Sequence, residues 1–206
     1  MWSSSLNNKV GVFGGTFNPP HNGHIKVAQR ALDQYSLSKV LFVPSGVPPH
    51  KTEVACGVTP EERYEMVRRA IQGYRNFDVS RIEIDRSGLS YTVDTIRELS
   101  RNYSEELCFI AGADLVLDIE SWKEPQALLA AVSFVLAPRN GIGNDAFSSS
   151  VFREADLRFL EMEEVDLSSR WLRERIAQGK SFSEWVPPEV ASFIREHRLY
   201  RQGGTA

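Results

Sequence analysis

The stretch Val10–Lys26, VGVFGGTFNPPHNGHIK, determines how the rest of the chain is interpreted. A short apolar run ends in a Gly-Gly turn, and two prolines and another glycine then lead into an amphipathic segment. A strand, a glycine-rich turn and a helix start, in this order, present unpaired backbone N–H groups to an anion. His21 and His24, where the helix is expected to begin, add donors that can carry charge near neutral pH. We therefore predict a phosphate site here.

The length and composition are those of an ordinary globular protein. The chain has 206 residues, 42% apolar and 25% charged, and we expect a single domain over residues 1–206, with a C-terminal helical subregion from about residue 168. The net charge of -3 argues against nucleic acid or an anionic membrane as a partner. There is no membrane-length apolar run and no signal-peptide pattern, so we expect a cytoplasmic location. Cys56 and Cys108 form no C-x-x-C pair, which favours two free thiols.

Strand and helix patterns alternate along the chain. Thr59 to Glu62 combines an N-cap, a proline and a capping-box glutamate, and Thr92 is expected to cap another helix. We predict strands at 9–13, 39–43, 77–84, 107–111, 133–137 and 157–162, and helices at 25–35, 59–73, 90–103, 125–131, 170–178 and 187–197. Several of the strands are wholly apolar, as in parallel sheets covered on both faces. The predicted fold is α/β: a Rossmann-like, doubly wound, mostly parallel sheet with helices on both faces and a small C-terminal helical segment.

Ligands of such sheets bind at the carboxyl ends of the strands. The Gly-Gly turn, Gly112-Ala113-Asp114 and Arg139 each follow a predicted strand, so we expect them to line one cleft. Paired histidines also suit zinc, but no nearby Cys, Asp or Glu completes a ligand set, and we expect no metal site in the protein. The absence of a G-x-S-x-G elbow argues against a serine nucleophile.

GGTFNPPHNGH resembles the signature of the nucleotidyltransferase superfamily that carries an [HT]-x-G-H motif, and the chain as a whole resembles the bacterial nicotinate-nucleotide adenylyltransferases. The further matches cover nearly the whole chain: Pro49-His50-Lys51, Ser90-Tyr91-Thr92, Asp94-Thr95, Gly112-Ala113-Asp114, Trp122, Arg139, Leu167-Ser168-Ser169, Leu172-Arg173 and the ending WVPPEVASFIREHRLY. The resemblance implies transfer of AMP from ATP to the 5′-phosphate of nicotinate mononucleotide, by direct in-line attack, giving deamido-NAD and pyrophosphate. Such a reaction depends on alignment and charge stabilisation, which need donors and cations.

The resemblance also implies roles for individual residues. The catalytic residues would be His21, His24, Lys51 and Arg173. ATP would contact Gly14, Gly15, Thr16, Phe17, Gly23, Gly112, Asp114, Arg139, Ser168 and Ser169. The mononucleotide would contact Thr16, Asn18, His50, Lys51, Thr92 and Trp122, with the Trp122 ring stacked on the pyridine. Mg²⁺ would arrive with ATP, and no tightly bound organic cofactor is implied.

Three alternatives remain open from the sequence: a nicotinamide-preferring adenylyltransferase, a phosphopantetheine adenylyltransferase and a non-catalytic nucleotide sensor. Phosphopantetheine adenylyltransferases share the first motif, but the matches at residues 49–51, at Trp122 and at the C-terminus fit them poorly. Retention of both histidines, Lys51 and Arg173 counts against a sensor. Arg170 and Asn140 depart from the family pattern, and the oligomeric state, monomer or homodimer, is open.

Overall fold

One parallel sheet forms the centre of the molecule. The computed structural model describes residues 6–48, 57–139, 142 and 144–201. Within them the strands pair in parallel in the order β3-β2-β1-β4-β5-β6. The strands are β1 (Val10–Gly15), β2 (Lys39–Pro44), β3 (Phe77–Val79), β4 (Leu107–Gly112), β5 (Ser133–Ala137) and β6 (Leu157–Phe159). This order confirms the predicted doubly wound fold, and it places the switch in strand order between β1 and β4.

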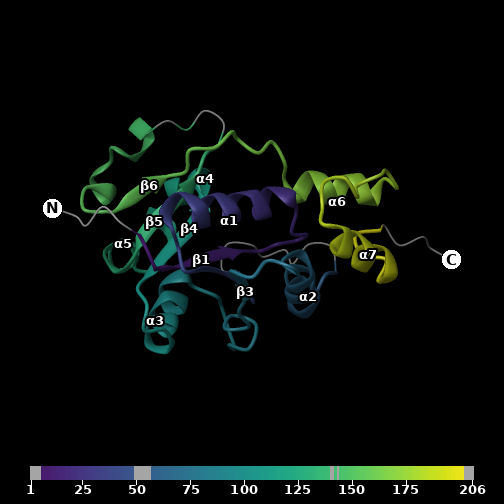
Figure 1. Cartoon of the computed structure of the whole chain (residues 1–206), viewed down its shortest axis with the longest axis horizontal. Coiled ribbons are helices and arrows are strands. Elements are labelled where there is room, and N and C mark those ends of the chain that lie inside the picture. The colour runs from purple at the N-terminus through teal and green to yellow at the C-terminus, as the bar shows by residue number, and fades with distance from the viewer. Residues whose placement is uncertain (1–5, 49–56, 140–141, 143, 202–206) are drawn as a thin grey trace.

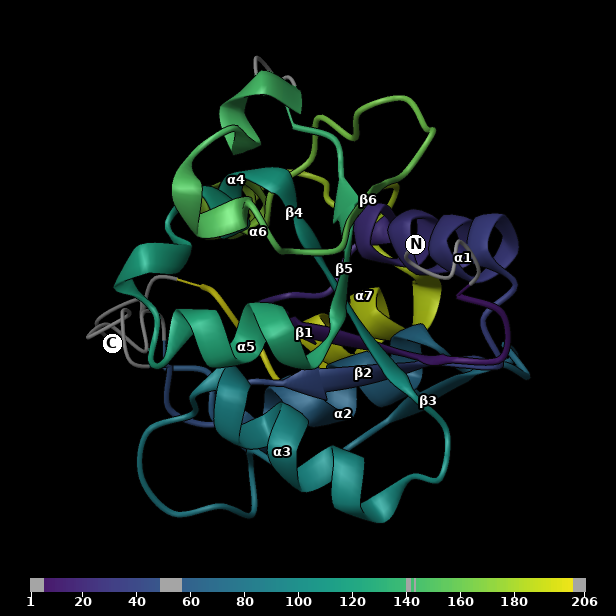
Figure 2. The same ribbon diagram turned by 90° about the vertical axis from the view of Figure 1, so that its left-hand side faces the viewer.

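Helices cover both faces of the sheet, as predicted (Figure 1). They are α1 (Asn22–Tyr35), α2 (Pro60–Ala70), α3 (Thr92–Asn102), α4 (Ala113–Leu117), α5 (Pro125–Ala131), α6 (Ser169–Ala177) and α7 (Pro188–Glu196), with short 3-10 turns η1 (Ile119–Ser121), η2 (Asn144–Phe147) and η3 (Ser150–Phe152). One apolar cluster joins Ala28 of α1, Met66 of α2 and Val190 of α7. The other joins Ile96 of α3 and Leu128 of α5, two helices that lie side by side (Figure 2).

Element boundaries differ from the predicted ones in two instructive places. The strand predicted over 77–84 ends at Val79, and the chain then turns, with the backbone N–H of Ile84 donating to Arg81 O at 2.8 Å. Glu83, which lies beyond the end of the strand, is nevertheless buried. Thr92 is the first helical residue and not the cap, a position that Tyr91 takes. The capping box of α2, from Thr59 and Glu62, is confirmed.

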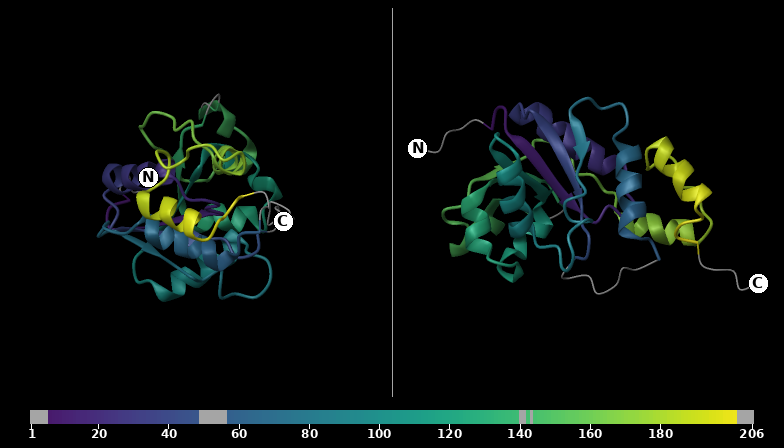
Figure 3. Two further views of the ribbon diagram at one scale, coloured as in Figure 1. Left: turned by 90° about the vertical axis from the view of Figure 1, so that its right-hand side faces the viewer. Right: turned by 90° about the horizontal axis from the view of Figure 1, so that it is seen from below.

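Helices α6 and α7 lie together at one end of the molecule, next to α2 (Figure 3). Arg69 of α2 lies 4.8 Å from the centre of the Phe193 ring of α7, and it pairs with Glu196 at 3.7 Å. Ser168 caps α6 by accepting a hydrogen bond from the Trp171 backbone N–H. The C-terminal helices are therefore packed directly on the sheet domain.

Two further sequence expectations concern the cysteines and membrane segments. Cys108 is a buried free thiol, and burial raises its pKa to about 12, whereas Cys56 lies outside the described residues. Within the part of the chain that the structure describes, no helix combines the length and the apolar character needed to cross a membrane.

Candidate active site

Two pockets meet at the carboxyl end of β1. The histidine pocket is lined by residues that include Phe17, His21, Gly23, His24, Gly112, Asp114, Arg139 and Val165. The tryptophan pocket is lined by residues that include Thr16, Ser45, Glu83, Ser90, Tyr91, Thr92, Phe109, Trp122 and Lys123. Gly14, Gly15 and Leu115 line both. The Gly-Gly turn is thus the place where ligands held in the two pockets would touch.

The start of α1 holds the two histidines together in the histidine pocket. The backbone N–H of His21 donates to Nδ1 of His24 at 3.1 Å, and the two rings stack with their centroids 3.7 Å apart. Because Nδ1 of His24 accepts this bond, the proton of the neutral imidazole lies on Nε2. His24 therefore keeps one N–H donor for an anion at the helix N-terminus.

The charge state of these histidines differs from the sequence expectation. His21 is only 4% exposed, and burial, together with the nearby Arg139, lowers its pKa to about 3. Burial, His21 and Arg139 also hold the pKa of His24 well below its ordinary value. Both side chains are therefore neutral donors at pH 7 in this state, which corrects the expectation of charge near neutral pH. The positive potential comes from Arg139 and from the N-terminus of α1.

Arg139 and Asp114 form the opposite wall of the histidine pocket. Arg139 follows β5, and its Nε lies 3.4 Å from Oδ1 of Asp114, which follows β4. Its Nη1 donates to Val165 O at 3.3 Å. A Cβ on Gly112 would come within 2.4 Å of that same Asp114 oxygen. Glycine at 112 therefore allows the carboxylate to turn back toward the guanidinium.

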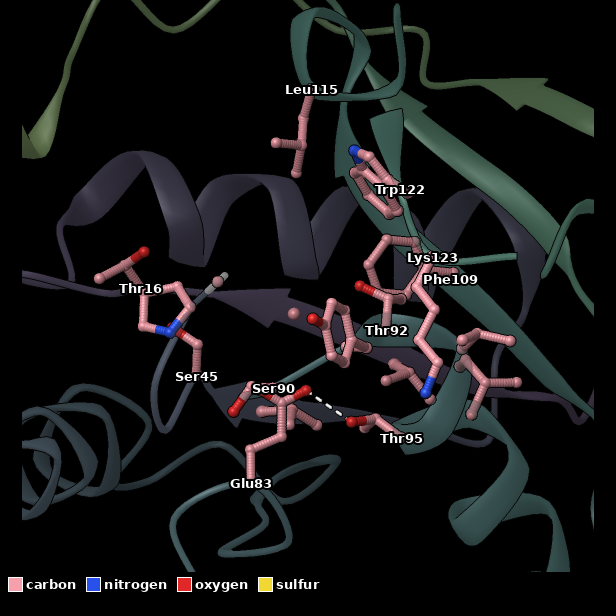
Figure 4. A pocket seen from close by; sticks show the side chains of 18 residues that line it. Thr16, Ser45, Glu83, Ser90, Thr92, Thr95, Phe109, Leu115, Trp122 and Lys123 are labelled. Atoms are coloured by element: carbon pink, nitrogen blue, oxygen red, sulfur yellow. Dashed lines mark hydrogen bonds between the residues drawn. The ribbon is translucent and has the colours of Figure 1, made fainter. Parts of the chain in front are cut away.

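The tryptophan pocket has two distinct ends (Figure 4). Thr16 and Ser45 lie at one end, and Trp122, Phe109 and Lys123 lie at the other. The Trp122 and Phe109 rings meet nearly at right angles, with centroids 6.3 Å apart. Thr92 lies at the first turn of α3, where backbone N–H groups lack intrahelical partners. Aromatic walls beside polar donors suit a flat ring with a polar substituent.

Arg63 of α2 is a buried functional candidate that sequence reasoning missed. Its side chain is 1% exposed and donates to Thr16 O at 2.9 Å and to Gly46 O at 3.0 Å. It thereby joins the loop after β1 to the loop after β2. A signal was present in the sequence, because Arg63 falls on the same helical face as Met66, Val67 and Ala70.

Glu83 was also missed, and it lies below the same loops. Its carboxylate accepts a hydrogen bond from Thr95 Oγ1 at 2.7 Å, and burial raises its pKa. Ser90 Oγ accepts from the backbone N–H groups of Gly46 and Val47 at 3.1 and 3.2 Å. A Cβ on Gly46 would lie 2.1 Å from Glu83 O, so the loop packs here without room for a side chain. These contacts fix the floor of the tryptophan pocket.

The predicted site residues divide into three groups. Those that line a pocket are Gly14, Gly15, Thr16, Phe17, His21, Gly23, His24, Thr92, Gly112, Asp114, Trp122 and Arg139. Asn18, Ser169 and Arg173 take part in contacts that hold the first loop, and Ser168 caps α6; none of the four is among the described residues lining either pocket. His50, Lys51 and Asn140 lie outside the described residues, and Arg170 is exposed.

The second group connects α6 to the first loop. Arg173 Nη1 donates to Asn18 O at 2.8 Å, and Ser169 Oγ donates to Pro19 O at 2.8 Å. Tyr200 OH donates to Oδ1 of Asn18 at 2.6 Å, in a buried bond. In this structure these residues act on the loop that carries the histidines.

Among the described residues, no group of three or more His, Cys, Asp or Glu side chains could hold a metal ion.

Comparisons with known proteins agree on one family. A family model described as cytidylyltransferase-like matches residues 12–175. A protein of Desulfitobacterium hafniense named "Probable nicotinate-nucleotide adenylyltransferase" is 40% identical over 200 residues, covering 94% of this chain and 96% of that protein. One of the same name from Rubrobacter xylanophilus is 42% identical over 197 residues, with 94% and 92% covered.

A solved structure shares the fold. It is that of Plasmodium falciparum nicotinic acid mononucleotide adenylyltransferase complexed with NaAD. It superposes with a TM-score of 0.78 at 17% identity, covering 94% of this chain and 98% of that one. The likeness in fold extends over nearly the whole chain.

Proposed function

Because the chain belongs to the nicotinate-nucleotide adenylyltransferase family, we propose that it transfers AMP from ATP to the 5′-phosphate of nicotinate mononucleotide, giving deamido-NAD and pyrophosphate. The observation that carries this proposal is the meeting of two pockets at Gly14 and Gly15. One pocket has donors and a cation suited to phosphates, and the other has aromatic walls suited to a base. A phosphate from each side would meet at the turn.

The reaction needs only one displacement at phosphorus. An oxygen of the mononucleotide phosphate forms a bond to the α-phosphorus of ATP, and the bond from that phosphorus to the β-phosphate oxygen breaks. Pyrophosphate leaves with the electron pair, and no covalent enzyme intermediate forms. The protein contributes by aligning the two phosphates and by stabilising charge on the leaving group.

In the histidine pocket, the Nε2–H of His24 would donate to the ATP phosphates, with His21 beside it and Arg139 supplying positive charge. Asp114 would accept from a ribose hydroxyl. In the tryptophan pocket, Trp122 would stack on the pyridine and Thr92 would contact the same end of the substrate. A neutral imidazole still donates one hydrogen bond, and in His24 that donor is Nε2–H.

Other predicted site residues are not among the described residues that line either pocket, and their proposed roles require contacts with the substrates. Arg173 gives one donor to Asn18 O, and because a guanidinium has five, the others would bind the β- and γ-phosphates. Ser168 and Ser169 would act through the start of α6. Lys51 would act on the phosphates, and His50 and Lys51 would contact the mononucleotide. We propose that Mg²⁺ accompanies ATP and that the partners are small molecules.

The test is pyrophosphate release by the full-length chain with ATP and Mg²⁺. Nicotinate mononucleotide, nicotinamide mononucleotide and phosphopantetheine are offered in parallel as acceptors. We expect release with the first and much less with the other two. Release with phosphopantetheine alone would assign a different transferase. Measurable nucleotide binding with no release from any acceptor would identify a sensor.

A further inference from the structure

Two ionisable side chains of opposite type line the tryptophan pocket. Of the described residues that line it, Glu83 and Lys123 are the ones with charged side chains. Glu83 lies toward Ser45, and its carboxylate is hydrogen-bonded to Thr95 (Figure 4). Lys123 follows Trp122 in the chain, and its side chain starts at the aromatic end and runs toward Thr95. The part of the pocket that would receive a ring is therefore lined by a lysine side chain.

The ammonium of Lys123 is held at the edge of the pocket by Asp94. Its Nζ lies 2.8 Å from Oδ2 and 3.2 Å from Oδ1 of Asp94, and 4.9 Å from the centre of the Tyr91 ring. An ammonium has three N–H donors, and the two Asp94 oxygens engage two of them. The lysine stem is flexible, so the group can turn toward an incoming anion without breaking the fold.

The charge matters because of what separates the two candidate rings. Nicotinate and nicotinamide mononucleotides share the ribose, the phosphate and a planar pyridine. They differ in a substituent that is an anionic carboxylate in one and a neutral amide in the other. With the phosphate at Gly14 and Gly15, the ring reaches the end that contains Trp122 and Lys123. Shape alone discriminates poorly between such substituents, whereas a nearby charge does so directly.

We propose that Lys123 is a specificity-determining residue, whose ammonium binds the ring carboxylate and thereby selects the acidic mononucleotide over its amide. The inference rests on the proposed function and deepens it by assigning the acid preference to one side chain. Asp94, which does not line the pocket, holds the ammonium in place until the carboxylate arrives.

The test compares kcat/KM for the two mononucleotides in Lys123→Met, which keeps an apolar stem over Tyr91 and removes the charge. We expect the value for nicotinate mononucleotide to fall about tenfold, as for loss of a charge-assisted hydrogen bond in a half-exposed site. The value for nicotinamide mononucleotide should stay within about twofold, and the KM for ATP should not change. Lys123→Arg, which keeps a positive charge, should retain most of the ratio between the two kcat/KM values.

Asp94→Asn is the matched control. It removes the ion pair while leaving the ammonium, so the preference for the acid should be kept or increased. If Lys123 served only to order the start of α3 through Asp94, both variants would lower kcat/KM for the two mononucleotides by the same factor. That result would overturn the proposal. An unchanged substrate ratio in Lys123→Met would overturn it as well.

Equilibrium binding of each mononucleotide, measured by calorimetry, separates this inference from the proposed function. Suppose the unmodified chain releases no pyrophosphate with either acceptor. Loss of acid-selective binding in Lys123→Met would then support the role of Lys123 while the transferase assignment fails. Active AMP transfer, together with an unchanged ratio of the two binding constants in Lys123→Met, would support the proposed function and contradict the role of Lys123.

Discussion

At the scale of single residues, His24 has one side fixed by the fold and the other left for a ligand. Its Nδ1 accepts from the His21 backbone, so Nε2 is the donor to phosphate. An asparagine at this position keeps an acceptor near Nδ1 but has nothing at Nε2. We predict that His24→Asn folds normally and loses about 100- to 1,000-fold in kcat, with a small change in the KM for ATP. Equal losses in both parameters would mean that His24 serves ground-state binding only.

His21 should make stability depend on acidity. Its pKa is about 3 in the folded chain, against 6.5 for an unperturbed histidine. Between these values the unfolded chain binds more protons, so the free energy of unfolding falls as the pH drops below about 6.5, and it is constant above. When the pH is lowered from 7 to 5, we predict that the free energy of unfolding of His21→Asn falls by about 2 kcal/mol less than that of the unmodified chain. Urea unfolding of both proteins at both pH values measures the difference. Equal losses of unfolding free energy in the two proteins would contradict the prediction.

Trp122 is expected to act on one substrate only. Its ring contacts Phe109 at the base end of the tryptophan pocket and is absent from the lining of the histidine pocket. We predict that Trp122→Ala raises the KM for the mononucleotide about tenfold, since loss of base stacking costs about 1–3 kcal/mol. The KM for ATP should be spared. A change confined to ATP would refute the stacking role.

At the scale of elements, Arg63 connects α2 to the loops after β1 and β2. Removing the guanidinium leaves two carbonyl oxygens, of Thr16 and Gly46, without the donor that they have in the buried loop. Each such loss costs about 1–3 kcal/mol. We predict that Arg63→Met lowers the free energy of unfolding by about 2–5 kcal/mol in urea titrations, and that Arg63→Lys loses less. Arg68→Met, on the exposed face of α2, is the control. Similar values for both methionine variants would contradict the role.

Element types were predictable because the periodicities are strong. The apolar runs of β1, β2, β4 and β5 and the amphipathic pattern of α3 follow from spacing alone. Element boundaries were less predictable where the sequence pattern continues beyond the last paired residue of a strand. The pattern over 77–84 alternates like a strand, but pairing with β2 ends at Val79 and the chain then turns. The sequence pattern does not show where the neighbouring strand stops pairing, because that depends on how the sheet is assembled.

At the scale of the whole molecule, the site is assembled from segments that are far apart in the chain. Asp114 and Arg139 could be named because each follows a strand end, and His21 and Trp122 could be named from the family resemblance. Sequence reasoning could not tell that Arg173 holds Asn18, since that depends on how α6 packs. Nor could it give the charge state of the histidines, which depends on their burial. We propose that residues 1–206 act as one domain, with the C-terminal helices as part of the site.

This proposal predicts a long-range effect of Tyr200. Its hydroxyl donates to Oδ1 of Asn18 at 2.6 Å, at the loop that carries His21 and follows the Gly-Gly turn shared by both pockets. We predict that Tyr200→Phe loses about 0.5–1.5 kcal/mol of stability and lowers kcat/KM for both substrates by a similar factor. Tyr74→Phe, at an exposed tyrosine, is the matched control and should change neither. A loss confined to one substrate would show that Tyr200 acts on one pocket and not on the shared turn.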